Sequence, residues 1–277
     1  MGPPFVVDDR LVELLEGLVC SELRRFADTA RRCFPDATAE SIDIGEGVAL
    51  FGGREIVFSQ ASGLGLDGPV DSAVIDDLDC FYREHEATSE VSVPSVAHES
   101  LMIGLAARGW VPTGFEDTLV LPLDAGMPTE PPDPAIDIRV VSAGERPAWG
   151  EAVAAGFAVG DGPGEIERRM GQVIAARDTT MLLWAWADGR PVATGELCIE
   201  QGVGWLSGDT TLPEYRGRGI QTALQRARIA LAREAGCALA VSEAVPGGTS
   251  HRNMERAWFR VAYTRLVMTR RWESGSS

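Results

Sequence analysis

Hydrophobic and polar positions in the second half of the chain predict a mixed succession of strands and helices. Apolar residues alternate with polar ones in the strand-like segments and recur every three or four positions in the helix-like ones. Strands are expected at residues 136–141, 181–187, 191–200, 203–211, 239–244 and 259–272. Helices are expected at 142–157, 165–177, 218–235 and 250–257. This order predicts a mixed sheet, mostly antiparallel, with one helix crossing between strands.

The helix at 218–235 has a clear apolar face. Spacing of three and four places a row of apolar side chains together: Ile220, Leu224, Ala227, Leu231 and Ala235. Gly236 is expected to end the helix, because glycine adopts the left-handed conformation that follows many helix termini.

The first half repeats this pattern at an offset of 148 residues. The strand-like segment 55–60 falls on 203–208, the helix-like segment 72–86 falls on 220–234, and 91–95 falls on 239–243. Arg108-Gly-Trp110 falls on Arg256-Ala-Trp258. The repeat predicts a duplicated α+β domain, each copy a mixed, mostly antiparallel sheet flanked by helices.

A proline-rich segment separates the two copies. Residues 124–135 hold four prolines and few apolar side chains, which is typical of a stiff, exposed linker. The predicted organisation is a first domain at 1–125, a linker at 126–135, a second domain at 136–272 and a polar tail at 273–277.

Charge is distributed unevenly between the halves. The net charge is -16, and residues 1–135 carry almost all of the excess, while 136–277 are close to neutral. Every cation is arginine. No basic stripe of the size that nucleic acids need is present, so nucleic-acid binding is disfavoured.

Composition excludes several other classes. No stretch approaches the roughly 20 apolar residues that span a bilayer, and no membrane association is expected. Five scattered cysteines indicate reduced thiols and a cytoplasmic protein. Neither they nor the three histidines have the spacing of a metal site. Residues 63–68 match Gly-x-Gly-x-x-Gly, but Pro69 and an acidic helix follow, which favours a flexible loop over a dinucleotide site.

The segment 210–224 carries the clearest chemistry. Gly217 and Gly219 lie where a strand gives way to a helix, so backbone amides and the helix dipole can face an anion there. Arg216 and Arg218 add positive charge beside these amides. The arrangement predicts a phosphate-binding helix N-terminus.

These residues resemble the GNAT superfamily of acyl-CoA-dependent N-acyltransferases. Its signature is Arg/Gln-x-x-Gly-x-Gly/Ala, and this chain has Arg216-x-x-Gly219-x-Gln221, with glutamine in place of the last small residue. Asn253 and the aromatic strand that starts at Phe259 also match, as does the element order over about 136–272.

The resemblance implies that acetyl-CoA, or another acyl-CoA, is a co-substrate with no metal involved. Its pyrophosphate would lie on the amides of 216–222, and its pantetheine arm between strands 203–212 and 239–244, which would splay apart. The implied cofactor-binding residues are Thr210, Thr211, Leu212, Arg216, Gly217, Arg218, Gly219, Ile220, Gln221, Thr222 and Asn253. The acyl group would pass directly to an amine in a ternary complex.

The same register in the first copy reads Gly68-Pro-Val-Asp71. Gly68 replaces Arg216 and Asp71 replaces Gly219. A carboxylate there would repel a pyrophosphate, so the first copy is predicted to be degenerate and to bind no CoA.

Four residues are candidates for acid-base chemistry. Glu196 lies in an otherwise apolar strand, Asp209 and Glu243 lie in the two cleft strands, and Tyr263 is a substitute for the tyrosine that the family often has in its last helix. Glu196 stands out among them, because an unpaired carboxylate in an apolar strand is costly, although a solvated strand face would explain it equally well.

The predicted function is transfer of an acetyl group to an amine of a small molecule, with cationic amines as candidates because of the acidic first half. A catalytically silent acyl-CoA sensor or scaffold and a protein N-acetyltransferase are the alternatives. The chain is expected to be a monomer or a homodimer.

Overall fold

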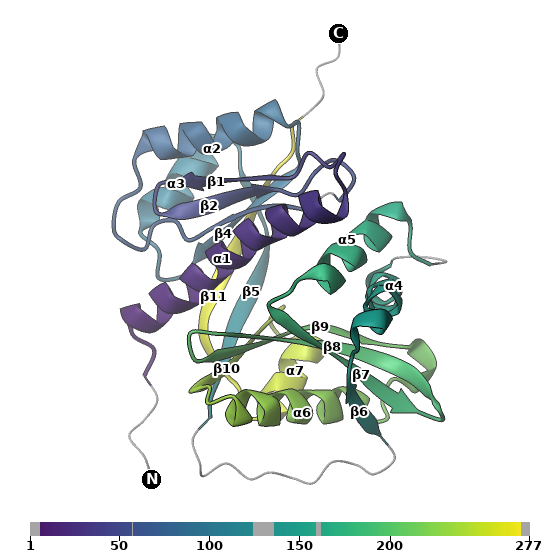
Figure 1. Ribbon diagram of the computed structural model, residues 1–277. Helices are drawn as coiled ribbons and strands as arrows, with labels where there is room; N and C mark the ends of the chain where they lie inside the picture. The colour runs from purple at the N-terminus through teal and green to yellow at the C-terminus, as the bar shows by residue number, and fades with distance from the viewer. Residues whose placement is uncertain (1–5, 57, 124–135, 159–161, 273–277) are drawn as a thin grey trace. The chain divides into compact units, whose positions relative to one another are not determined.

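The computed structural model describes residues 6–56, 58–123, 136–158 and 162–272. The chain divides into two compact units (Figure 1), unit 1 formed by residues 1–117 and 262–277 and unit 2 by residues 118–261. This division differs from the predicted ranges 1–125 and 136–272, because the last strand of the chain belongs to unit 1. The predicted linker at 126–135 and tail at 273–277 lie outside the described residues.

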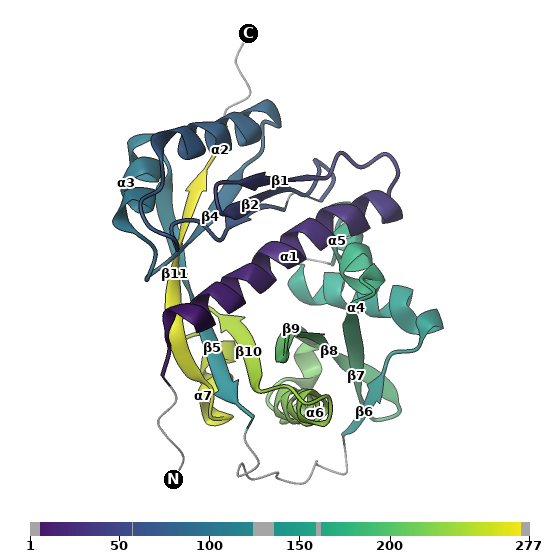
Figure 2. The same ribbon diagram turned by 60° about the vertical axis from the view of Figure 1, so that its left-hand side comes forward.

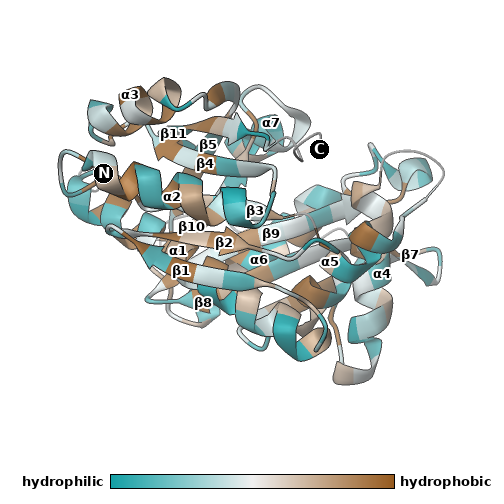
Figure 3. Ribbon diagram, turned by 90° about the horizontal axis from the view of Figure 1, so that it is seen from above, coloured by the Kyte–Doolittle hydropathy of each residue, from teal (hydrophilic) through white to brown (hydrophobic). Residues whose placement is uncertain are grey.

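Unit 1 consists of a sheet between helices. Its elements are α1 (Asp9–Cys33), β1 (Glu40–Ile44), β2 (Gly47–Phe51), β3 (Ser59–Ser62), α2 (Ser72–Glu84), β4 (Ser89–Pro94), α3 (Glu99–Ala107), the first part of β5 (Val111–Pro122) and most of β11 (Arg260–Arg270). Asp8 caps α1 by accepting a hydrogen bond from the Leu11 amide at 3.0 Å, and α1 packs on β1, β2 and β3. Figure 3 shows teal and brown segments along the helices, as expected when one face is buried.

The strands of unit 2 have helices on both faces. Its elements are the end of β5, β6 (Asp137–Val140), α4 (Arg146–Phe157), α5 (Glu165–Ala176), β7 (Thr180–Ala187), β8 (Arg190–Glu200), β9 (Val203–Thr211), α6 (Ile220–Glu234), β10 (Leu239–Ala244) and α7 (Thr249–Arg256). The strand order from β5 is β5-β10-β9-β8-β7-β6. One apolar cluster lies between the sheet and α6, and another joins α4 and α5 to β7. The element order predicted for this half is the order observed.

The two halves share one element order. Three strands, a helix, a strand, a helix and a strand appear as β1-β2-β3-α2-β4-α3-β5 and again as β7-β8-β9-α6-β10-α7-β11. In each, the strands on either side of the crossover helix are parallel, β3 with β4 and β9 with β10. The other pairings with a described register are antiparallel. The predicted fold class, a mixed and mostly antiparallel sheet in an α+β protein, is confirmed.

The repeat is less regular than the predicted constant offset. Element starts differ by 148 residues for α2 and α6 but by 150 for β4 and β10. Segment 55–60 is a strand only from Ser59, because residues 54–56 form a turn. At the ends of α3 and α7, Gly109 corresponds to Trp258, since the amides after them reach back to Leu105 and Met254 in the same way.

The last strands of the two halves are exchanged. In unit 1 the neighbour of β4 is β11, with Arg265 opposite Pro94 and Arg270 opposite Ser89. In unit 2 the neighbour of β10 is β5, and the Leu123 amide donates to the Ala238 carbonyl at 2.8 Å. Figure 2 shows β5 and β11 side by side. Each unit is therefore completed by a strand from the other half of the sequence.

Candidate active site

The cleft of unit 2 begins where β9 and β10 stop pairing. Their parallel register runs from Val203 opposite Leu239 to Leu206 opposite Ser242, although β9 continues to Thr211. The Ser242 hydroxyl closes the paired region by donating to the Leu206 carbonyl at 3.0 Å. Beyond this point the two strands no longer pair, as the splayed cleft requires.

An irregularity in β9 lies at the start of the cleft. The register with β8 shifts between Thr194 and Glu196, and Gly208 has φ +66°, a conformation that glycine adopts easily. A side chain at Gly208 would also come within 3.2 Å of the Trp149 ring. Gly208 and Asp209 have no partner in the β8 register, which resumes at Thr210 opposite Thr194.

The loop before α6 leaves the helix N-terminus open. Gly217 and Gly219 have φ +75° and +76°, and nothing lies within 4 Å of where their side chains would be. They are therefore needed for their backbone conformation and not for lack of space. Gly219 is the N-cap of α6, and among the described residues no side chain caps the helix there. The first amides of α6 are left without a side-chain acceptor, as an anion site requires.

This N-terminus opens into a cavity of about 400 Å³. Most of the predicted cofactor-binding residues line it, together with residues that sequence reasoning did not include. The lining consists of Gly156, Asp209, Thr210, Thr211, Tyr215, Arg216, Gly217, Gly219, Ile220, Gln221, Thr222, Gln225, Arg228, Thr249, Ser250, Asn253 and Met254. Leu212 and Arg218 are not among them. The Arg218 guanidinium lies 4.6 Å from the centre of the Tyr215 ring.

Backbone carbonyls at the end of β9 already have partners. The Gln221 side chain donates to the Thr210 carbonyl at 2.8 Å and to the Thr211 hydroxyl at 2.7 Å. The Arg216 Nε donates to the Thr211 carbonyl at 3.2 Å, and the Leu212 amide donates to the Val192 carbonyl at 3.0 Å. A ligand that used the Thr210 or Thr211 carbonyl would share it with Gln221 or Arg216, because a carbonyl oxygen can accept two hydrogen bonds.

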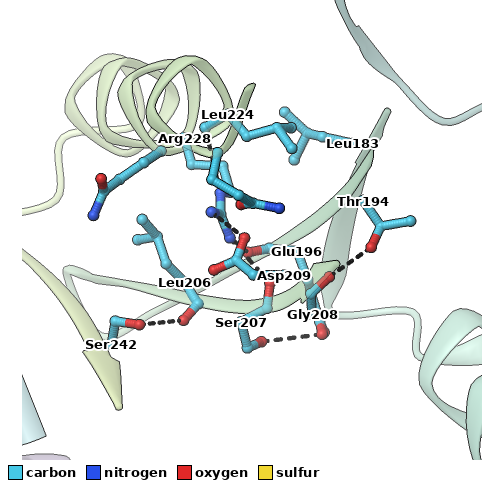
Figure 4. A network of polar contacts seen from close by, with 12 residues as sticks. Leu183, Thr194, Glu196, Leu206, Ser207, Gly208, Asp209, Leu224, Arg228 and Ser242 are labelled. Atoms are coloured by element: carbon cyan, nitrogen blue, oxygen red, sulfur yellow. Dashed lines mark hydrogen bonds and ion pairs between the residues drawn. The ribbon is translucent and has the colours of Figure 1, made fainter. Parts of the chain in front are cut away.

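Asp209 is the one carboxylate among the lining residues. Its side chain is 24% exposed and lies 2.5 Å from Nη2 of the fully buried Arg228. Burial raises the pKa of Asp209 above its ordinary value, and the Arg228 guanidinium partly opposes that shift. Figure 4 shows the carboxylate pointing at the guanidinium.

Glu196 is placed differently. Its side chain is 2% exposed, it pairs with Arg177, and its Oε2 accepts a hydrogen bond from the Ser207 hydroxyl at 3.0 Å. It does not line the cavity. A buried carboxylate in an apolar strand is here half of an ion pair.

The other two candidates are not brought to the cavity either. Glu243 is partly buried on β10 and is not a lining residue. Tyr263 lies in unit 1, where its hydroxyl donates to Glu16 at 2.7 Å and accepts from Arg265 at 3.3 Å. Its place in unit 1 follows from the exchange of β11, which no local pattern predicts.

Two of the lining residues that the sequence did not predict, Gly156 and Arg228, make close contacts with β9. Gly156 of α4 lies so close to β9 that a side chain there would come within 2.3 Å of Thr210. Arg228 lies on the buried face of α6, where the apolar pattern predicts no charged residue. The signal was its spacing, four residues from both Leu224 and Ala232, which are buried.

Comparisons with known proteins agree with this geometry. Residues 155–252 match the acetyltransferase (GNAT) family. The second half of this chain contains a GNAT domain. A search of curated protein sequences finds no significant match.

Solved structures extend the likeness to nearly the whole chain. A GCN5-related N-acetyltransferase from Kribbella flavida is 18% identical, with a TM-score of 0.64 over 92% of this chain and 96% of that one. One from Sphaerobacter thermophilus is also 18% identical, with a TM-score of 0.63 over 92% and 94%. A tandem GNAT protein from the clavulanic acid biosynthesis pathway is 11% identical, with a TM-score of 0.63 over 99% and 98%. At these identities the likeness is one of fold, and it is the tandem GNAT fold.

In the equivalent loop of the first GNAT-like unit, backbone amides donate hydrogen bonds to side chains of the same unit. Asp71 caps α2 by accepting from the Ala73 amide at 2.9 Å. The Leu66 amide donates to Glu46 and the Val70 amide to the Ser100 hydroxyl, both at 2.8 Å. Three amides of this region, those of Leu66, Val70 and Ala73, are therefore engaged within unit 1, whereas among the described residues no side chain caps α6.

Proposed function

We propose that this protein transfers an acyl group, acetyl in the simplest case, from acyl-CoA to an amine. The observation that carries the proposal is the open N-terminus of α6, where the amides after Gly219 face a cavity beside Arg216. Uncapped amides and the positive end of a helix favour a phosphate group. The arm that joins the pyrophosphate to the thioester would lie where β9 and β10 no longer pair.

Asp209 is the proposed general base. It is the candidate carboxylate that lines the cavity, and a pKa raised by burial makes it a better proton acceptor than an ordinary aspartate. The amine nitrogen attacks the thioester carbonyl, forming a C–N bond and breaking the C–S bond. Asp209 takes the proton that the nitrogen loses, and the thiolate leaves with a proton from solvent. Asn253, which also lines the cavity, would hold the pantetheine arm.

The acceptor is proposed to be a small molecule, with cationic amines as the first class to test. The acidic residues of the first half favour the approach of a cation by long-range attraction. A peptide N-terminus or lysine side chain is the competing acceptor class.

Two measurements test this function together. Calorimetric titration of the protein with CoA and acetyl-CoA should show one site per chain. The rate of thiol release from acetyl-CoA should then be measured with a panel of polyamines, aminoglycosides and short peptides. With at least one amine, this rate should exceed the rate of acetyl-CoA hydrolysis without an acceptor. If CoA binds but no acceptor causes thiol release, the acyl-CoA sensor is favoured. If neither CoA nor acetyl-CoA binds, both functions are refuted.

A further inference from the structure

Arg228 is a cation placed where a helix normally carries an apolar side chain. It lies on the buried face of α6, one turn after Leu224 and one before Ala232, and none of its side chain is exposed. Burial of a guanidinium is costly unless each of its donors finds an acceptor. Packing alone therefore does not explain the contacts of Arg228.

The donors of Arg228 meet the irregular part of the β8–β9 ladder. Nη1 donates to the carbonyls of Glu196 at 3.1 Å and Ser207 at 3.0 Å, and Nε donates to Leu224 at 3.3 Å. Nη2 donates to Oδ1 of Asp209 at 2.5 Å. Figure 4 shows the guanidinium against this part of the ladder. One side chain thus contacts both strands at the pair next to the register shift, Glu196 opposite Ser207, and also the Asp209 carboxylate that follows this pair.

The neighbouring strand leaves room for this guanidinium. A side chain on Gly195 of β8 would come within 3.2 Å of the Arg228 Cζ and Nε atoms. Gly195 and the buried Arg228 therefore fit one another.

Asp209 has no second polar partner among the residues that the structure describes. Its carboxylate contacts Arg228 through Oδ1, and its side chain also lines the cavity. Arg228 therefore fixes both the position and the charge state of a group that faces the site.

We propose that Arg228 is the positioning residue for Asp209, holding its carboxylate ionised and turned toward the cavity. This inference rests on the proposed function, in which Asp209 accepts the proton of the attacking amine. Because an opposite charge favours the ionised form, removal of Arg228 should raise the pKa of Asp209. As a result, the pH at which the base becomes active should rise as well.

The test compares the variants Arg228→Met and Arg228→Lys. The control is Arg226→Met, the same arginine-to-methionine change at an exposed position of the same helix. Carboxyl carbon NMR, assigned with Asp209→Asn, follows the titration of Asp209 in each protein. Thiol release gives kcat/KM as a function of pH, and calorimetry gives the affinity for CoA. Arg228→Lys keeps the charge and covers the case in which Arg228→Met fails to fold.

Arg228→Met is expected to raise the Asp209 pKa and to move the acid limb of kcat/KM upward by the same amount. The affinity for CoA should stay within about threefold, Arg228→Lys should lie in between, and Arg226→Met should match the original protein. In an Asp209→Asn background, Arg228→Met should lower the rate no further. An unchanged Asp209 pKa in both Arg228 variants would overturn the inference. Absence of thiol release by the original protein would refute the proposed function alone, because the NMR titration does not depend on activity.

Discussion

Trp258 has a backbone conformation that suits glycine. It follows α7 with φ +70°, its amide reaches back to Glu255 and the Phe259 amide to Met254, and its side chain is 71% exposed. Gly109 and Gly236 occupy the same position after α3 and α6. A tryptophan there is strained and recovers little of the cost by burial.

Trp258→Gly should therefore raise the free energy of unfolding by about 1 kcal/mol. Chemical denaturation followed by circular dichroism measures it. Trp258→Ala is the matched control, because it removes the ring but keeps the strain. A glycine variant no more stable than the alanine variant would contradict this explanation.

Asp209 sets the expected pH dependence of activity. As a base it must be ionised, so kcat/KM should fall as the pH is lowered through its pKa. Burial raises that pKa above the ordinary 3.8, so the loss should begin at a higher pH than for an exposed aspartate. Asp209→Asn should lower kcat by about 100-fold or more while CoA still binds. Activity within about twofold of the original would show that Asp209 is not the base.

At the scale of elements, the two crossover helices differ at their first turn. Asp71 caps α2, whereas Gly219 leaves the start of α6 open to the cavity. The same strand–helix–strand arrangement thus has a self-contained loop in unit 1 and a candidate anion site in unit 2. The difference lies in side chains and not in topology.

Asp71→Ala should lower the stability of unit 1 by about 1 kcal/mol, because the Ala73 amide loses its acceptor. It should leave the affinity for CoA unchanged. Asp67→Ala, an exposed position in the same loop, removes the same charge without removing a cap. Equal melting temperatures for the two variants, or weaker CoA binding by Asp71→Ala, would argue against the assigned role.

At the scale of the whole molecule, each unit contains strands from both halves of the sequence. β11 supplies unit 1 with Arg265, which lies 2.7 Å from the buried Glu16. Glu16 belongs to α1, near the other end of the chain. Neither predicted domain, 1–125 or 136–272, contains all the strands of one unit.

In a chain that ends at Val261, unit 1 should not keep its folded structure. It would lack the strand next to β4, and Glu16 would stay buried without its cation, a change that typically costs about 3–5 kcal/mol. Amide hydrogen exchange should show loss of protection in α1 and β1–β4. A chain that ends at Trp272 is the control, and it should keep that protection. Equal protection in both would mean that β11 is not needed by unit 1.

Local patterns predicted much of the fold and part of the site. The elements of the second half follow from apolar periodicity and from glycines such as Gly219 and Gly236, whose effects are local. The exchange of β5 and β11 is a choice between similar long-range pairings, which periodicity does not encode. Likewise, Glu196 and Asp209 look alike as carboxylates in strands, and only the partners Arg177 and Arg228 separate them. Arg228 is not predicted by the sequence pattern, because a charged residue interrupts the apolar spacing that identifies a buried helix face.

The most direct test of the central claim is an amide NMR titration of the whole protein with CoA. If the open N-terminus of α6 binds the pyrophosphate, the amides of residues 217–222 should shift and saturate at one CoA per chain. The amides of 71–74 in unit 1 should stay where they are. Saturable shifts at 71–74 without shifts at 217–222, or no saturable shifts at either, would contradict the account.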